Sequence, residues 1–166
     1  MRRKNLFLTI GVPGSGKSTW LKENCQGVIV SRDEIRFALL NEGDDYFSKE
    51  NEVFETFIKT IQNALDDEEG PVSVFVDATH LNKASRDKVL NALDLSNVEH
   101  VHAIFFDVAL TTCLERNDKR TGRAFVPKSV IRRMNFSLEM PTSKERFEAI
   151  LIVNNKGMIM EVETFG

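Results

Sequence analysis

The residues from Gly11 to Ser18 are the part of this sequence whose types and spacing point most directly to chemistry. They read Gly-Val-Pro-Gly-Ser-Gly-Lys-Ser, which fits the phosphate-binding pattern G-x-x-x-x-G-K-[ST]. The glycines let the backbone turn tightly, so that several N–H groups face one anion at the start of a helix. In this pattern the lysine reaches the β- and γ-phosphates of a nucleoside triphosphate, and the final hydroxyl binds Mg²⁺. The alternative is a chance glycine turn that leads into a helix.

The flanks of this loop have the order that a phosphate-binding loop requires. Residues 6–10 are apolar and of strand length, and a helix is expected over 17–24. We therefore predict that the chain binds ATP, or another nucleoside triphosphate, together with Mg²⁺, and that Lys17 takes part in catalysis. The residues of this segment expected to hold the nucleotide are Gly11, Pro13, Gly14, Ser15, Gly16, Lys17, Ser18 and Thr19.

A second group of charged residues follows the predicted strand 28–31. Asp33 and Arg36 are three positions apart, so on the opening turn of a helix they share one face. Ligands of a parallel α/β sheet bind at the carboxyl ends of its strands. Asp33 is therefore a candidate general base for an attacking hydroxyl, and Arg36 a candidate clamp for an anionic acceptor. The alternative is a helix start with favourable acidic residues and a surface arginine.

Asp77 ends the apolar run 72–77. A carboxylate at this place beside a phosphate-binding loop orients Mg²⁺ or its waters. We predict that Ser18 and Asp77 hold the metal; the alternative is that Asp77 caps the next helix. Thr79 and Asn82 follow at the rim of the same site. They are candidates for contact with the acceptor, with turn and cap roles as the alternative.

Three arginines, Arg116, Arg120 and Arg123, lie close together beside Gly122. Guanidinium groups stabilise the charge that spreads over the γ-phosphate oxygens during transfer, and small kinases carry such groups on a lid that closes over the nucleotide. We predict a lid over about 116–138 in which Arg116 and Arg123 bind the nucleotide and Arg120 acts in catalysis. The alternative is a basic helix end exposed to solvent.

Strand-like and helical segments alternate along the chain, which is typical of an α/β domain with a parallel sheet. We predict a single P-loop NTPase domain over residues 1–166, with about five parallel strands flanked by helices and a small helical lid. A short edge hairpin through 155–157 is expected after the last strand. The expected strands are 6–10, 28–31, 72–77, 101–107 and 149–154, and the expected helices are 17–24, 31–41, 48–65, 82–93, 110–119 and 127–138.

The composition is that of an ordinary globular protein, with 42% hydrophobic and 28% charged residues. No apolar run approaches the length of a membrane span, and the run after the basic N-terminus is too short for a signal-peptide core. Cys25 and Cys113 have neither metal-ligand spacing nor a disulfide framework, so we expect a reducing, cytoplasmic setting, in a host cell if the chain is phage-encoded. The net charge of −3 argues against a nonspecific nucleic-acid binder but allows a local basic patch.

Four stretches together resemble the kinase domain of phage 5′-polynucleotide kinase. They are residues 8–20 with the phosphate loop, the segment 31–36 with its Arg-Asp-Glu-Ile-Arg run, the segment 77–82, and 116–120 followed by Val126-Pro127. The resemblance extends over about residues 5–138. The loop alone is shared by many enzymes, whereas the Asp33 and Arg36 pair together with the arginine lid is much more specific.

The resemblance implies transfer of the γ-phosphate of a nucleoside triphosphate to the 5′-hydroxyl of DNA or RNA, an activity of nucleic-acid repair. Asp33 would be the general base on that hydroxyl, and Arg36 would hold the 3′-phosphate of the terminal nucleotide. Lys17 would serve the donor phosphates, Ser18 the metal and Arg120 the transition state. Recognition of a strand end needs a narrow channel with a few arginines, which is compatible with the net charge.

The phage enzyme continues into a phosphatase domain with an Asp-x-Asp-Gly-Thr motif. This sequence lacks that motif, so we expect no 3′-phosphatase activity. Two other interpretations stay open: a small-molecule kinase of the same architecture, acting on a sugar, nucleoside or aminoacyl group, and a nucleotide-dependent switch without transfer activity. The choice between DNA and RNA ends, the preferred triphosphate and the oligomeric state are also open at this point.

Overall fold

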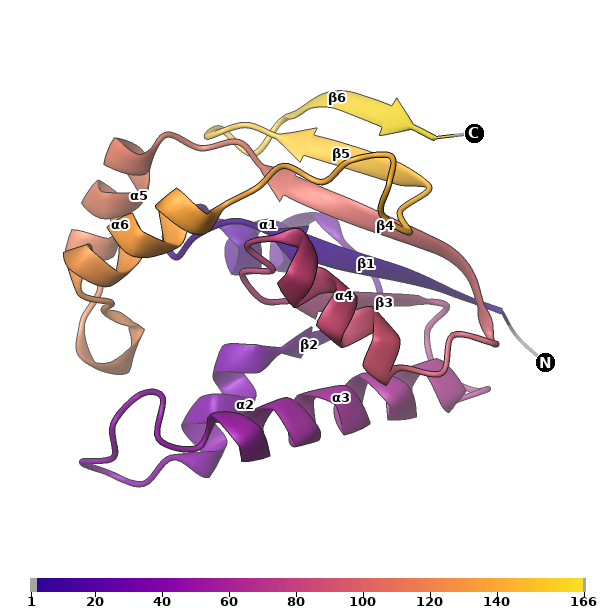
Figure 1. Ribbon diagram of the computed structural model, residues 1–166, viewed down its shortest axis with the longest axis horizontal. Coiled ribbons are helices and arrows are strands. Elements are labelled where there is room, and N and C mark those ends of the chain that lie inside the picture. Colours follow the sequence, from indigo (N-terminus) through magenta and orange to yellow (C-terminus); the bar gives the residue numbers. More distant parts are fainter. Residues whose placement is uncertain (1–2, 166) are drawn as a thin grey trace.

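A six-stranded sheet runs through the centre of the computed structural model, which describes residues 3–165 (Figure 1). Its strands are β1 (Lys4–Ile10), β2 (Val28–Ser31), β3 (Ser73–Asp77), β4 (Val98–Phe106), β5 (Ala149–Val153) and β6 (Ile159–Thr164). They lie in the order β2-β3-β1-β4-β5-β6. The first five strands are parallel, and β6 pairs antiparallel with β5. The ends of β1, β2 and β3 therefore meet at one edge.

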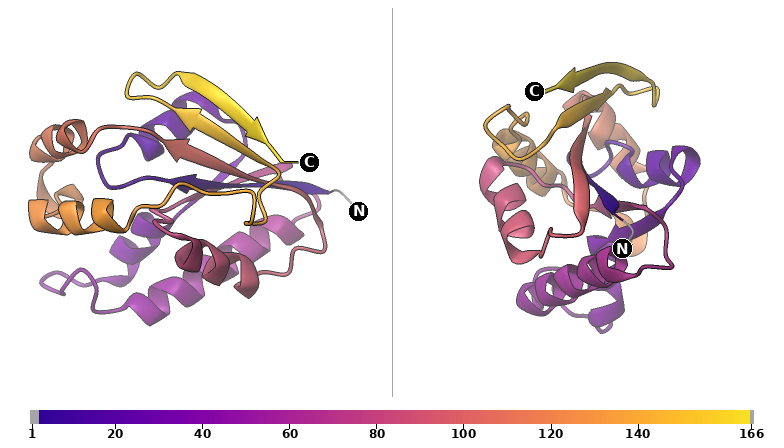
Figure 2. Two further views of the ribbon diagram at one scale, coloured as in Figure 1. Left: turned by 45° about the horizontal axis from the view of Figure 1, so that its top comes forward. Right: turned by 90° about the vertical axis from the view of Figure 1, so that its right-hand side faces the viewer.

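Helices cover the two faces of the sheet and the space beyond the carboxyl ends of its strands (Figure 2). One face packs against α1, and the other packs against α3 and α4. Helices α5 and α6 lie beyond the strand ends and are joined by a loop with one short 3₁₀ turn, η1. The helix bounds are α1 Lys17–Asn24, α2 Arg32–Leu39, α3 Glu50–Asp66, α4 Lys83–Ala92, α5 Leu110–Asp118, η1 Gly122–Ala124 and α6 Lys128–Ser137.

The core explains why the strand ends are held rigidly. In α3, Phe57, Ile61 and Leu65 recur every four residues, so they form one stripe that is fully buried against the sheet. On the opposite face, Trp20 of α1 packs edge-on against Phe106 of β4, with ring centroids 5.7 Å apart. Buried apolar layers therefore hold the sheet from both sides, and the loops at the strand ends start from this packed frame.

A buried ion pair holds the loop that follows β3. Arg86 of α4 donates to both carboxylate oxygens of Glu145 at 2.7 and 3.1 Å. The same guanidinium donates to the carbonyl oxygens of His80 and Glu139 at 2.9 and 3.0 Å. A buried charge is tolerated when it is paired and its donors are satisfied, as they are for this arginine. The contacts fix the segment 78–82 against the chain between α6 and β5.

The predicted α/β fold is confirmed, and several elements differ from the prediction in detail; β1 and β4, for example, begin earlier, at Lys4 and Val98. The sheet has six strands, because the expected hairpin through 155–157 adds β6 as an antiparallel edge strand. The helix expected to reach residue 41 ends at Leu39, since residues 40–49 form an irregular loop before α3. Pro127, expected as the first helical residue, is the N-cap of α6.

Within residues 3–165, no helix combines the length and the apolar character needed to cross a membrane.

Candidate active site

The loop between β1 and α1 has the shape of an anion-binding nest. Gly14 and Gly16 have φ angles of +87° and +92°, in the left-handed region that favours glycine. A Cβ on Gly14 would also collide with the carbonyl group of Cys113 on α5. The Oγ atom of Ser15 is buried and has no hydrogen-bond partner among the residues that the structure describes. An orphaned hydroxyl in a glycine loop at a helix start fits a phosphate oxygen.

Lys17 lies folded across this loop. Its Nζ atom donates to the carbonyl oxygen of Val12 at 3.1 Å, and its side chain is buried. Burial lowers the pKa of Lys17, while the carboxylates of Asp77 and Asp33 oppose this shift. A phosphate oxygen is a stronger acceptor for an ammonium group than a neutral carbonyl. The lysine therefore has a resting partner that a nucleotide can replace.

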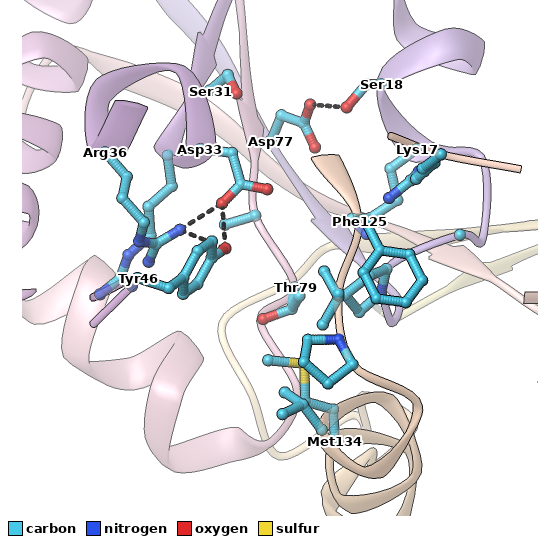
Figure 3. A pocket seen from close by; sticks show the side chains of 18 of the residues that line it. Lys17, Ser18, Ser31, Asp33, Arg36, Tyr46, Asp77, Thr79, Phe125 and Met134 are labelled. Atoms are coloured by element: carbon cyan, nitrogen blue, oxygen red, sulfur yellow. Dashed lines mark hydrogen bonds and ion pairs between the residues drawn. The ribbon is translucent and has the colours of Figure 1, made fainter. Parts of the chain in front are cut away.

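Ser18 and Asp77 meet where α1 begins and β3 ends (Figure 3). The Ser18 hydroxyl donates to Oδ2 of Asp77 at 2.6 Å, and the aspartate is almost fully buried. Hydroxyl and carboxylate oxygens are the ligands that Mg²⁺ prefers beside phosphates, where it also keeps several waters. The predicted metal pair is therefore brought together, and its donor atoms fit Mg²⁺.

A cavity of about 430 Å³ separates the phosphate loop from α2. Its apolar wall comes from the segment between α5 and α6 and from α6 itself, through Phe125, Pro127 and Met134 among others (Figure 3). Charged and polar side chains of the other walls come from the loop, from α2, from the end of β3 and from the segment before α6. They include Lys17, Ser18, Asp33, Arg36, Asp77, Thr79 and Arg120. With Tyr46, Phe47 and Glu50, which also line it, the cavity brings together residues from five separate stretches of the sequence.

Asp33 and Arg36 form one network with Tyr46 and Glu50 on the wall opposite the loop. Arg36 forms an ion pair with Asp33 through NH1 and donates from the same nitrogen to the Tyr46 hydroxyl at 2.8 Å. Its Nε and NH2 atoms donate to the two Glu50 oxygens at 2.8 and 3.1 Å. The arginine is only 5% exposed. Its donors therefore face protein acceptors, so to clamp a substrate anion, as the sequence suggests, it would have to exchange one of them.

The three lid arginines lie at three different places. Arg116 donates to the carbonyl oxygens of Gly14 at 3.3 Å and Asn155 at 2.7 Å, beside the phosphate loop. Arg120 lines both the main cavity and a second one of about 340 Å³ between α1, α5 and the β5–β6 hairpin. Arg123 instead donates to the carbonyl oxygen of Phe37 at 2.9 Å. Arg116 and Arg120 thus lie where a nucleotide would bind, whereas Arg123 lies beside α2.

The segment after β3 divides into one residue at the cavity and two with structural contacts. Thr79 lines the cavity, and its carbonyl accepts from the Gly11 N–H at 3.0 Å. The Asn82 side chain accepts from the Ser85 N–H at 2.9 Å in a capping box at the start of α4, so the structure places it in the alternative role. His80 has a φ of +42° and lies buried 2.6 Å from the Thr9 carbonyl oxygen.

Sequence reasoning missed Tyr46, Glu50 and the apolar wall of the cavity, which comes from residues 125–134. Tyr46 follows a Gly-Asp-Asp break and carried no motif of its own, and Glu50 looked like an ordinary acidic residue at a helix start. The apolar lid residues had a weak signal, because an apolar Phe-Val-Pro run directly follows the arginines. Only the pairing with Arg36 in three dimensions marks Tyr46 and Glu50 as site residues.

A domain that places such a loop opposite a carboxylate, across a cavity with an arginine in its lining, has the organisation of a P-loop kinase-type domain. Comparison with known families agrees with this class. Residues 6–141 match the AAA domain family AAA_33, and the chain belongs to this family.

The similar proteins have different descriptions, which name a polynucleotide kinase or RNA repair in some cases and a sugar kinase in another. A "Putative bifunctional polynucleotide kinase/RNA ligase" of Autographa californica nuclear polyhedrosis virus is 29% identical over 164 residues. The match covers 92% of this chain and 22% of that protein, so the chain spans less than a quarter of its relative.

Among solved structures, a chain of the Pnkp1/Rnl/Hen1 RNA repair complex superposes with a TM-score of 0.68 and 24% identity, over 83% of this chain and 45% of that one. An unliganded sugar kinase from Janibacter sp. HTCC2649 superposes with a TM-score of 0.63 and 17% identity, over 93% and 86%. These likenesses show the fold, which nucleic-acid-repair proteins and sugar kinases share.

Proposed function

We propose that this chain is an ATP-dependent polynucleotide 5′-hydroxyl kinase. The observation that carries the proposal is the position of Asp33, whose carboxylate lines the same cavity as Lys17 and Ser18 but on the opposite wall. An acceptor bound between them has its hydroxyl beside a carboxylate and its line of attack toward the donor phosphate. This is the arrangement that phosphoryl transfer needs, because catalysis of that reaction is mostly positioning and charge stabilisation.

The reaction follows from these positions. Asp33 accepts the proton of the acceptor hydroxyl while the oxygen forms a bond to the γ-phosphorus and the bond to the β,γ-bridging oxygen breaks. Lys17 and Arg120 stabilise the charge on the phosphoryl oxygens and on the departing diphosphate. Mg²⁺ held by Ser18 and Asp77 would neutralise charge on the β- and γ-phosphates.

The apolar wall supports a nucleoside acceptor. Phe125, Val126 and Pro127 line the cavity together with Tyr46, and Figure 3 shows Phe125 on the side away from Tyr46. A flat nucleobase can pack against these apolar surfaces. The relative described as a polynucleotide kinase/RNA ligase points to the same class of acceptor. An end of a strand, with one nucleoside inside the cavity, is therefore the acceptor that we favour.

The test is transfer of label from γ-labelled ATP to matched acceptors in the presence of Mg²⁺. These are 5′-hydroxyl DNA and RNA oligonucleotides, the same oligonucleotides with 5′-phosphates, and a 3′-phosphorylated nucleoside. We expect label on the 5′-hydroxyl oligonucleotides, none on the 5′-phosphorylated ones, and loss of the signal in Asp33→Asn. Absence of label from every oligonucleotide would contradict the proposal.

A kinase of a small hydroxylated molecule is the second candidate, and one observation favours it. A further cavity of about 290 Å³ adjoins Tyr46 and Phe125, and its charged lining residues are Glu42, Asp44 and Arg123. Two carboxylates against one guanidinium make this cavity unfavourable for a phosphate backbone. Sugars and nucleosides belong in the same assay for this reason, and label on these alone would favour the second candidate.

A further inference from the structure

The two carboxylate oxygens of Asp33 have different surroundings. Oδ1 accepts a hydrogen bond from the Tyr46 hydroxyl at 2.7 Å and also pairs with Arg36. Oδ2 has no hydrogen bond to any of residues 3–165, and Figure 3 shows it pointing away from Arg36 and Tyr46 toward the cavity. One oxygen is therefore anchored to the protein, and the other is available to a substrate.

We infer that Tyr46 is a positioning residue that anchors Oδ1 of Asp33 so that Oδ2 receives the proton of the acceptor hydroxyl. The inference rests on the proposed function, since it assigns Asp33 the role of general base. It adds a residue to the site that lies in the loop between α2 and α3 and has no recognisable motif. Tyr46 itself keeps its proton and exchanges no bond with the substrate.

The position of Tyr46 is fixed by contacts on several sides. Its ring packs edge-on against Phe47 with centroids 4.6 Å apart, and the Arg36 guanidinium lies 4.3 Å from its centroid. Glu50 holds that guanidinium from the other side through two hydrogen bonds. Burial and the neighbouring carboxylate of Asp33 both raise the pKa of Tyr46. The hydroxyl therefore remains a donor wherever Asp33 is ionised.

The geometry has a chemical consequence for the base. A hydrogen bond donated to one carboxylate oxygen limits rotation of the carboxylate, which keeps Oδ2 facing the acceptor. Loss of the hydroxyl should therefore lower the fraction of time for which Oδ2 is correctly oriented.

The variant Tyr46→Phe tests this inference, because it keeps the ring beside the Arg36 guanidinium and removes the hydroxyl with its hydrogen bonds to Asp33 and Arg36. We expect kcat to fall about tenfold with KM for ATP unchanged, since the change affects the orientation of the base and not the binding of the nucleotide. The matched control is Ser48→Ala, which removes a hydroxyl from the same loop that donates to the Asp45 carbonyl at 2.7 Å. The control should leave kcat unchanged.

A second readout does not depend on turnover. Carbon-13 NMR of aspartate-labelled protein at one fixed pH reports the surroundings of each carboxyl group, and Asp33 is assigned by the signal that Asp33→Asn lacks. We expect the Asp33 signal to move in Tyr46→Phe, because its carboxylate loses a hydrogen bond. If the signal stays in place, the inference is wrong. If no acceptor is phosphorylated but the signal moves, the proposed function fails while the link between Tyr46 and Asp33 holds.

Discussion

The two walls of the main cavity are built in different ways. The donor wall is formed mainly by the consecutive residues 11–18, joined by Asp77 from the end of β3. Its candidate contacts with an anion and its metal are backbone N–H groups, one lysine and the Ser18–Asp77 pair. The acceptor wall is formed by side chains from α2, from the loop 40–49 and from the start of α3. A backbone site is specified by a local pattern, whereas a side-chain network depends on how separate elements pack. The donor wall therefore defines the class of the protein, and the acceptor wall defines its substrate.

The largest expected loss of transfer rate comes from a substitution in the donor wall. Lys17→Met keeps much of the side-chain length and removes the cation from the phosphate site. We expect transfer to fall on the order of 10³-fold and the concentration of ATP needed for half-saturation to rise. Steady-state kinetics at varied ATP measure both. Lys22→Met is the matched control, since Lys22 is exposed in the last turn of the same helix. An equal loss in both variants would contradict a specific role for Lys17.

A smaller effect is expected from the acceptor wall. Glu50→Gln keeps the shape but removes a negative charge beside Arg36 and Arg32, to which Glu50 is bonded at 2.8 and 3.3 Å. Without that charge, the guanidinium groups should bind the Asp33 carboxylate more tightly and restrain it from the acceptor hydroxyl.

The kcat of Glu50→Gln should therefore fall severalfold, with KM for ATP unchanged. Glu52→Gln is the control, because Glu52 is exposed in the same first turn of α3 and should leave kcat unchanged. An equal loss of kcat in Glu50→Gln and Glu52→Gln would contradict this electrostatic account of the acceptor wall.

The smallest effect on the reaction is expected from the sheet and the loop after β3, which support both walls. Here the expected change is in the stability of the fold. Burial lowers the pKa of His80 to about 4, and its Nδ1 atom lies beside a backbone carbonyl. Because the pKa is lower in the folded chain than in the unfolded one, the unfolded chain takes up a proton first as the pH falls below 6.5. The free energy of unfolding should thus fall between pH 6.5 and 4, by about 3 kcal/mol from this residue alone.

Urea unfolding at a series of pH values measures this dependence. His80→Asn is a suitable comparison, because asparagine tolerates the left-handed backbone of His80 and does not titrate. Between pH 6.5 and 4, the free energy of unfolding should fall less in His80→Asn than in the wild-type protein, by the contribution of His80. Parallel curves for the two proteins would show that His80 does not contribute.

The frame and the donor wall could be predicted from the sequence because their signals are local. The apolar run before Gly11, the glycines and the helix after Ser18 fixed one strand, one turn and one helix in order. Alternating strands and helices then specified a parallel sheet, and Asp77 was placed correctly at the end of the strand that pairs with β1.

The acceptor wall could be predicted only in part. Asp33 and Arg36 were found as a pair on one helix face, and the structure places them so. Their partners Tyr46 and Glu50 lie in a loop without periodicity and at the start of another helix, and nothing in the local sequence joins these to α2. Arg123 shows the same limit, because its guanidinium reaches the Phe37 carbonyl across a distance in sequence that no spacing rule covers.

The central claim is that the two walls have separable tasks, with Asp33 acting on the acceptor alone. The most direct test is the rate of phosphate transfer by Asp33→Asn as a function of ATP concentration, with a 5′-hydroxyl oligonucleotide in excess. We predict saturation at the same ATP concentration as the wild-type protein and a maximal rate that is lower by about 10³-fold. A maximal rate close to that of the wild type, or a loss that ATP concentration restores, would contradict the claim.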